Sequence, residues 1–226
     1  MAGTPSRRIA WLAGATGLIG RALLPRLLVG DAYAAVHVLV RRPLSGVASH
    51  PRLFAHEVDF AALPDTLPGV DDVYIALGTT IKVAGSEAAF RTVDHDYVLN
   101  VARAGRERGA KRIAVVSALG ADAGSRVFYN RVKGEMQRDI ARLGYTCITI
   151  AQPSLLLGDR SALGQPVRSG EVWAGWLLRP VMGMVPRGMR PIPADDVAAA
   201  LLAATLRGEP GTTVLASGTM LGAASA

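Results

Sequence analysis

Three polar residues stand at spacings that suit proton transfer between a side chain and a carbonyl or alcohol oxygen. Tyr129 and Lys133 are four residues apart in a segment with helical periodicity, so both side chains lie on one helix face. Ser117 ends the apolar run before that segment. A neighbouring ammonium favours the phenolate form of a tyrosine, which makes Tyr129 a candidate acid and base for the reacting oxygen. Ser117 would donate a hydrogen bond to the same oxygen. A tyrosine and a lysine at this spacing also occur on ordinary surface helices, so the pair needs a structural context.

A glycine-rich turn near the N-terminus supplies that context. An apolar run over residues 8–13 stops at Gly14, and glycines recur at Gly17 and Gly20 before a helical pattern begins. Gly14 would let the chain leave a strand sharply, Gly17 would let backbone approach a pyrophosphate, and Gly20 would let the helix pack closely on the sheet. The helix N-terminus adds unpaired N–H groups and a partial positive charge. The turn predicts a dinucleotide site, although an ordinary strand–turn–helix has the same outline. The binding residues would be Gly14, Ala15, Thr16, Gly17, Leu18, Ile19 and Gly20.

Two arginines after the second predicted strand bear on which dinucleotide is bound. A site for NAD places an acidic residue about twenty positions after the glycine turn, where it accepts bonds from a ribose hydroxyl. Arg41 and Arg42 stand there instead, directly after the run 36–40. Guanidinium groups suit a 2′-phosphate through forked, charge-assisted bonds. We therefore expect NADP(H) over NAD(H), with two solvated arginines at a strand end as the alternative.

The arrangement of the predicted elements defines a fold class. Strands alternate with helices along the first 150 residues, which is typical of a parallel sheet with helices on both faces. We predict an α/β fold of the Rossmann type, a doubly wound parallel sheet of about six or seven strands. One domain would span residues 1–226, with 158–192 as a small lobe on the substrate side, inserted before the final helix and strand. Ligands bind beyond the carboxyl ends of such strands. The predicted strands deliver five residues to that edge: Gly14, Arg41, Gly78, Ser117 and Pro153.

Single residues also predict where some elements bend, begin or end. Pro25 should kink or shorten the first helix because it removes a helical hydrogen bond. Residues 52–60 have the pattern of a strand with Asp59 at its end, and residues 125–143 have that of a helix. Asp195 or Asp196 is expected to cap a helix over residues 193–206.

The composition excludes several other classes of protein. The net charge is +7, but the basic residues are scattered without an aromatic-interleaved stripe, so we expect no nucleic-acid partner. No apolar run reaches membrane-spanning length, so we expect no membrane partner either. The histidines lack metal-ligand spacing, which predicts that there is no metal site. The single cysteine, Cys147, and an N-terminal segment without an apolar signal core predict a cytoplasmic location.

Seven motifs resemble those of the short-chain dehydrogenase/reductase superfamily. The likeness is to an atypical member, in the group of HIV Tat-interacting oxidoreductase-like proteins and small bacterial NAD(P)H-binding relatives. The motifs occur in the family's order at residues 14–20, 41–42, 77–80, 93–98, 117–122, 129–135 and 152–158. The resemblance implies a Rossmann-type core, bound NADPH, and the roles of Ser117, Tyr129 and Lys133 given above. It also implies which further residues border the cofactor. Those on the nicotinamide side are Leu77, Gly78, Thr79, Thr80, Pro153, Ser154 and Leu155, and those on the adenine side are Asp59 and Phe60.

These observations favour an NADP(H)-dependent oxidoreductase that acts on a small carbonyl or alcohol substrate. Arginines within 160–190 could select an anionic substrate. The segment after Leu157 is short, which argues against a large nucleotide-sugar substrate. Two alternatives stay open, namely a redox-sensing NADPH-binding regulator without turnover and a nucleotide-sugar epimerase or dehydratase. The protein is expected to be a monomer or a homodimer.

Overall fold

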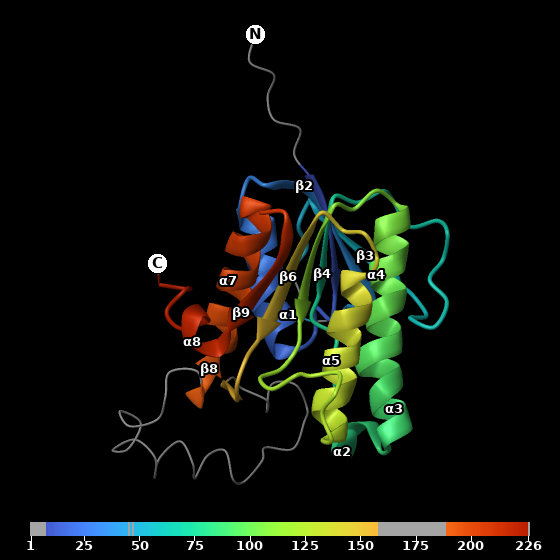
Figure 1. The fold of residues 1–226 in the computed structure, drawn as a ribbon. Coiled ribbons are helices and arrows are strands. Elements are labelled where there is room, and N and C mark those ends of the chain that lie inside the picture. The colour runs from blue at the N-terminus through green and yellow to red at the C-terminus, as the bar shows by residue number, and fades with distance from the viewer. Residues whose placement is uncertain (1–7, 45, 47, 158–188, 226) are drawn as a thin grey trace.

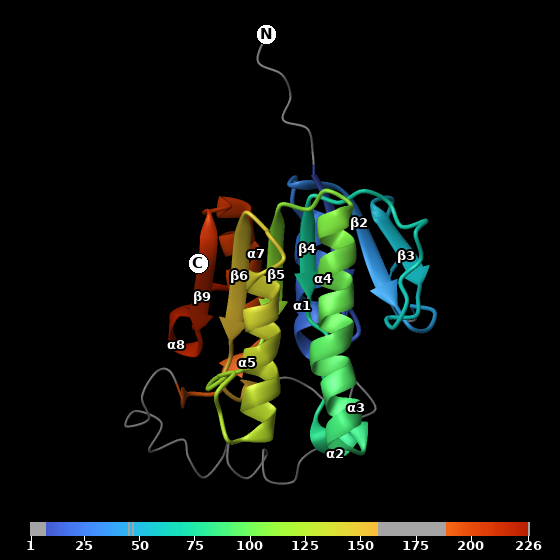
Figure 2. The ribbon, with the colours of Figure 1, turned by 45° about the vertical axis from the view of Figure 1, so that its right-hand side comes forward.

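The structure, a computed structural model, describes residues 8–44, 46, 48–157 and 189–225. Its centre is a sheet of seven parallel strands in the order β3-β2-β1-β4-β5-β6-β9. Figure 2 shows the strands side by side, with their arrowheads at one edge. The strands are β1 (Arg8–Ala13), β2 (Tyr33–Val40), β3 (Leu53–Glu57), β4 (Asp72–Ile75), β5 (Arg112–Val116), β6 (Cys147–Gln152) and β9 (Gly211–Ala216). The predicted Rossmann-type sheet is confirmed, and the strand order reverses between β1 and β4.

Helices cover both faces of this sheet (Figure 1). One face carries α4 (Tyr97–Glu107) and α5 (Phe128–Ala141), and the other carries α1 (Leu18–Val29) and α7 (Ala194–Arg207). The short elements are α2 (Ile81–Ala84), α3 (Glu87–Arg91), η1 (Thr92–Asp96), β7 (Leu156–Leu157), β8 (Ile192–Pro193) and α8 (Ser217–Met220). None of the helices in the described residues is long and apolar enough to cross a bilayer. The proposed lobe falls mainly on residues 158–188, which lie outside the described part of the chain.

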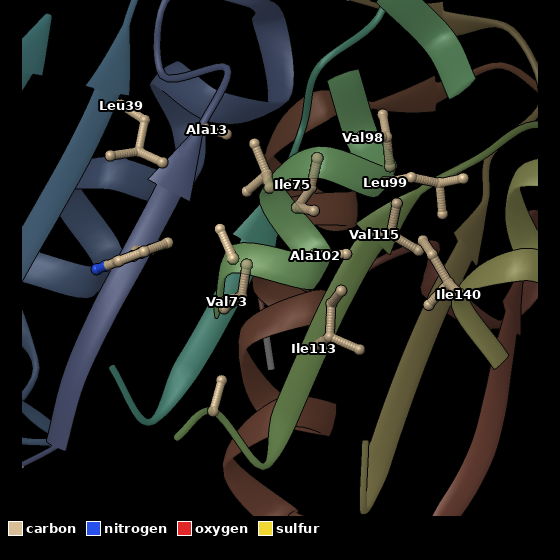
Figure 3. Close-up of a cluster of buried hydrophobic side chains, with 14 of the residues drawn as sticks. Ala13, Leu39, Val73, Ile75, Val98, Leu99, Ala102, Ile113, Val115 and Ile140 are labelled. Atoms are coloured by element: carbon tan, nitrogen blue, oxygen red, sulfur yellow. The ribbon is translucent and has the colours of Figure 1, made fainter. Parts of the chain in front are cut away.

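Two apolar layers hold the helices on the sheet. Figure 3 shows the layer beneath α4 and α5, where Val73, Ile75 and Ile113 meet Val98 and Ala102. The opposite layer joins α1 and α7 to the other face of the same strands. Apolar burial on both faces explains why the central strands β1, β4, β5 and β6 are nearly continuous apolar runs without alternation.

The amino-terminal edge of the sheet is held by a buried polar network. Arg8, Tyr33, Asp72 and Arg112 are each the first residue of a strand. The Asp72 carboxylate is fully buried and lies 2.6 Å from both the Arg112 Nε and the Tyr33 hydroxyl, and 3.0 Å from an Arg8 nitrogen. Burial, together with Tyr74 and Asp72, raises the pKa of Tyr33 well above its usual range. The network therefore ties four neighbouring strands together at the edge opposite to the expected ligand site.

Two expectations about where elements begin and end are wrong. The third strand, β3, ends at Glu57, because Asp59 forms a turn in which its side chain accepts the Ala61 N–H at 2.8 Å. The helix expected from residue 125 begins at Phe128, since the Ser125 hydroxyl binds the Val127 N–H in a local turn.

Pro25 does not shorten its helix as expected, and the predicted capping aspartates do not cap theirs. Helix α1 continues through Pro25 to Val29, with Leu24 and Leu28 buried on either side of the proline. Packing therefore outweighs the lost hydrogen bond in setting the length of this helix. Pro193 is the N-cap residue of α7, and no side chain caps that end. Asp195 pairs with Arg26 of α1 at 2.8 Å, and Asp196 accepts the N–H groups of residues 222 and 224.

Candidate active site at the carboxyl edge of the sheet

The glycine turn lies between β1 and α1 at the carboxyl edge. Gly14 has a φ of +92°, and a Cβ there would lie 2.5 Å from the Ala76 carbonyl carbon. A Cβ on Gly20 would lie 2.0 Å from the Gly14 oxygen, so α1 could not approach the turn. Gly17 differs from both, because its φ of −78° suits any residue and its added Cβ would meet nothing closer than 3.5 Å. The protein itself thus requires glycine at positions 14 and 20, whereas a Cβ at Gly17 would make only ordinary van der Waals contacts.

The start of α1 offers backbone N–H donors beside Gly17. No side chain caps the helix at Gly17, and its first turn contains no acidic residue. The first N–H groups of a helix have no intrahelical partner and attract anions. Of the other predicted binding residues here, Ala15 and Ile19 are buried in the apolar layer beneath α1. The Thr16 carbonyl accepts a bond from the Arg21 guanidinium at 3.1 Å.

Arg41 and Arg42 lie next to this turn and are exposed. They follow Val40 directly, and Leu39 pairs in register with Ala13 of β1. A cavity of about 510 Å³ lies between α1 and the segment that follows the two arginines, with Thr16, Arg21 and Leu44 in its wall. None of its lining residues comes from α5, so this cavity is separate from the Tyr129 and Lys133 side chains.

The segment after β4 joins the glycine turn to the second half of the site. Leu77 is half-buried against the core, and its nitrogen would lie 2.7 Å from a Cβ on Gly14. The Thr79 N–H donates to Asp94 Oδ2 at 2.8 Å. Thr80 caps α2, because its hydroxyl accepts the Val83 N–H at 3.2 Å. The predicted residues 77–80 thus connect Gly14 to the helix that contains Asp94.

Helix α5 brings Tyr129 and Lys133 to the same edge. The helix packs on the loop after β5 at Gly134, where a Cβ would lie 2.1 Å from the Asp122 carbonyl carbon. Lys133 is 3% exposed, and its Nζ lies 2.7 Å from Asp94 Oδ1. A Cβ on Gly78 would lie 3.9 Å from the same Nζ, so the ammonium sits directly beside the segment after β4. Tyr129 is half-exposed one turn earlier, and its ring lies 5.2 Å from that of Phe90.

Ser117 directly follows β5, and its side chain contacts α5. Its hydroxyl is buried and accepts a hydrogen bond from Gln137 Nε2 at 2.5 Å. The Gln137 Oε1 in turn accepts a bond from Gln152 at 3.2 Å. Gln137 is eight residues beyond Tyr129, which is about 12 Å along the helix axis. Ser117 thus contacts α5 two turns beyond Tyr129, and its role toward the substrate oxygen stays a prediction.

The remaining predicted cofactor residues make contacts within the protein. The Pro153 carbonyl accepts the Leu119 N–H at 2.9 Å. Ser154 donates to the Arg190 carbonyl at 2.5 Å and lies 2.9 Å from the Ser217 hydroxyl, while Leu155 is 40% exposed. On the expected adenine side, Phe60 is a buried core residue whose ring lies 6.0 Å from that of Tyr97, and Asp59 is exposed in its turn.

Sequence reasoning assigned Asp94 no role in the site, although the residue lies in the motif at 93–98. It is 1% exposed in η1, a wide helical turn between α3 and α4. His95, the next residue, is also buried, with its ring nitrogens 2.8 Å from an Asp96 oxygen and 3.1 Å from an Asp139 oxygen. Wide turns of this kind inside α-helices are rare and frequent at functional sites. Among the described residues, no group of three or more His, Cys, Asp or Glu side chains could hold a metal ion.

Comparisons with known proteins agree with this geometry. Residues 14–154 match the model of a family described as NAD(P)H-binding. The protein FMP52, mitochondrial, of Eremothecium gossypii is 37% identical over 152 residues, which cover 67% of each chain. The protein HTATIP2 of Rattus norvegicus is 33% identical over 180 residues, covering 78% of this chain and 71% of that protein.

Solved structures share the fold. MoeE5 in complex with UDP-glucose and NAD superposes with a TM-score of 0.66 and 17% identity, over 91% of this chain and 74% of that chain. The crystal structure of gox2253 gives a TM-score of 0.68 and 22% identity, over 92% of this chain and 70% of that chain. At these identities the likeness is one of fold.

The sheet topology and the glycine turn define a protein that binds a nicotinamide dinucleotide through a Rossmann-type domain. The chain belongs to the NAD(P)H-binding family, as an atypical short-chain dehydrogenase/reductase that resembles the HTATIP2 group. The prediction of a cytoplasmic location is wrong, because relatives from several fungi are designated mitochondrial. Having a single cysteine does not separate these two compartments.

Proposed function

We propose that this protein is an NADP(H)-dependent oxidoreductase that transfers a hydride between the nicotinamide and a small carbonyl or alcohol substrate. One observation carries the proposal. The Lys133 ammonium lies beside Gly78 at the carboxyl end of β4, and Tyr129 is one turn away on the same face of α5. The segment after β4 also packs on Gly14, so the glycine turn and the tyrosine–lysine pair belong to one site.

The chain's own residues fit a nicotinamide dinucleotide. The absence of a Cβ at Gly17 and the uncapped start of α1 suit a pyrophosphate, and the exposed Arg41 and Arg42 suit a 2′-phosphate. When bound, NADPH supplies the hydride. Lys133 would hold the nicotinamide ribose, and Tyr129 would donate a proton to the oxygen of the substrate. The arginines that could select an anionic substrate lie mostly outside the described residues.

Tyr129→Phe tests this proposal. The variant keeps the ring against Phe90 and loses only the hydroxyl, so NADPH should bind as tightly as it does to the wild type. Turnover of any carbonyl substrate found in a panel screen should fall about 100-fold or more, because one general acid contributes that much to a rate. Tyr97→Phe is a matched control, since Tyr97 lies against Phe60 in the core. Turnover retained by Tyr129→Phe would contradict the assignment of the acid.

A second candidate function is an NADPH-binding regulator that senses the state of the cofactor without turnover. The hydrogen bond from Gln137 to Ser117 is the observation that favours it, because this serine is already engaged within the protein. Such a protein would bind NADPH and NADP⁺ with different surfaces exposed and would oxidise no NADPH across a broad carbonyl panel. Limited proteolysis with each cofactor form, run beside the panel, separates the two functions.

A further inference from the structure

We infer that Asp94 is the positioning residue for Lys133: its carboxylate compensates the charge of the buried ammonium and fixes the direction in which Lys133 donates to the cofactor ribose. The inference rests on the proposed function for its consequence, but the contact between the two residues does not depend on that function. Both side chains are almost completely buried, and they come from two separate helical segments.

The surroundings of the pair make each charge dependent on the other. Asp94 Oδ1 receives no well-aligned hydrogen bond from the described residues, and the Lys133 ammonium 2.7 Å away is what compensates its charge. The other oxygen, Oδ2, accepts the Thr79 N–H. A buried ammonium without a nearby carboxylate tends to lose its proton. Removing the charge at position 94 should therefore leave Lys133 prone to neutralisation.

The other charged groups near the pair already have partners. Within η1, His95 lies against Asp96 and Asp139. From the end of α3, Arg91 pairs with Glu135 of α5. The segment after β4 approaches the pair at Gly78 and through the Thr79 N–H, and neither residue is charged. Tyr129, one turn before Lys133 on α5, is the other titratable side chain on this face. Asp94 is thus the one carboxylate among the described residues that is paired with Lys133.

The geometry also assigns the donors of the ammonium. A lysine ammonium has three N–H donors. One is directed at Asp94, which leaves two for the neighbouring hydroxyl groups of a ribose placed beside Gly78. Asp94 thereby fixes both the charge of Lys133 and the direction in which it donates, and it does so at the segment that packs on the glycine turn.

Asp94→Asn is the sharpest test, because the amide oxygen can still accept the Thr79 N–H, while the NH2 group in place of Oδ1 offers Lys133 neither a charge nor an acceptor. NADPH affinity, followed by nicotinamide fluorescence from neutral to alkaline pH, should fall for this variant as the pH rises, by about tenfold relative to the wild type. Adding Lys133→Met to Asp94→Asn should abolish this pH dependence. Asp96→Asn is the matched control, because Asp96 lies two residues further in η1 and contacts His95.

A second measurement works without any cofactor. The chain has three lysines, of which Lys82 and Lys111 are exposed, so a protein labelled at the lysine Cε should give a separate NMR signal for Lys133. In Asp94→Asn, that signal should change from the ammonium to the amine position at lower pH than in the wild type. Identical titrations in both proteins would overturn the inference. If the wild type bound no NADPH, the proposed function would fail, while the NMR comparison would still decide the role of Asp94.

Discussion

At the scale of single residues, the candidate site contains residues whose type the fold does not explain. Gly14 and Gly20 are explained by backbone contacts, whereas Gly17 has room for a side chain and carries none. Arg41 and Arg42 are exposed beside the same turn. These are the residues that we propose select the dinucleotide.

The preference for NADPH can be tested at Arg41 and Arg42. Replacing both with alanine should lower the affinity for NADPH at least about tenfold. The affinity for NADH should stay nearly unchanged, because NADH lacks the 2′-phosphate that these arginines would bind. Fluorescence titration with each nucleotide gives the ratio. Arg103→Ala removes an exposed arginine from α4, on the opposite face of the sheet, and should change neither affinity. An unchanged ratio in the double variant would contradict the assignment of these arginines.

At the scale of elements, α5 is fixed to the helix beside it by charged side chains. Asp139 of α5 contacts Arg138 and reaches His95 of η1. The hydrogen bond from Arg138, with help from His95, lowers the pKa of Asp139 from 3.8 to about 2. A carboxyl whose pKa is depressed in the folded protein adds stability above its unfolded pKa and loses it as the pH falls through the folded value.

Asp139→Asn should therefore destabilise the protein in a way that depends on pH. Near neutral pH we expect a loss of about 1 kcal/mol in the free energy of unfolding, which is modest because Asp139 and Arg138 are partly exposed. The difference from the wild type should disappear between pH 3.8 and about 2. Urea unfolding across that range measures it, with the exposed Glu209→Gln as the control. A constant difference at all pH values would show that packing and not charge is responsible.

The elements were predicted from the sequence more completely than the contacts of single side chains. The order of strands and helices, the glycine turn, and the shared face of Tyr129 and Lys133 depend on local patterns and were predictable. The direction of the Ser117 hydroxyl was not, since it depends on which layer of the protein meets the end of β5. Asp94 was missed because helical periodicity assumes a regular α-helix, and the wide turn at η1 breaks that register.

At the scale of the whole molecule, the two edges of the sheet have different tasks. The amino-terminal edge contains the buried network around Asp72, and the carboxyl edge holds the candidate site. The polar side chains of the network at the amino-terminal edge bind one another. Those at the second edge include open donors and half-exposed side chains, as a binding site requires.

Asp72→Asn tests this division. Removing one charge from a buried network leaves Arg8 and Arg112 without their shared partner, so the free energy of unfolding should fall by about 3 kcal/mol. NADPH affinity should be unchanged under conditions where the variant is folded. Chemical denaturation and fluorescence titration give the two quantities. Asp65→Asn, at a fully exposed carboxylate near Arg108, should alter neither. A large loss of affinity in folded Asp72→Asn would show that the two edges are coupled.

The wide turn at η1 has a consequence for how this region can change. It interrupts the continuous helical segment that runs from Glu87 to Glu107. The extra residue shifts the helical register of α4 relative to α3 by about one residue, or roughly 100° of rotation about the helix axis. The first half points Phe90 at Tyr129, and the second half points Val98 and Ala102 at the sheet. Deleting one residue from η1 would restore the regular α-helical hydrogen-bond pattern. It would also rotate either α3 or α4 about the helix axis, so that its side chains no longer face their present partners. The wide turn therefore allows one continuous helical segment to contact the candidate site with its first half and the core with its second half.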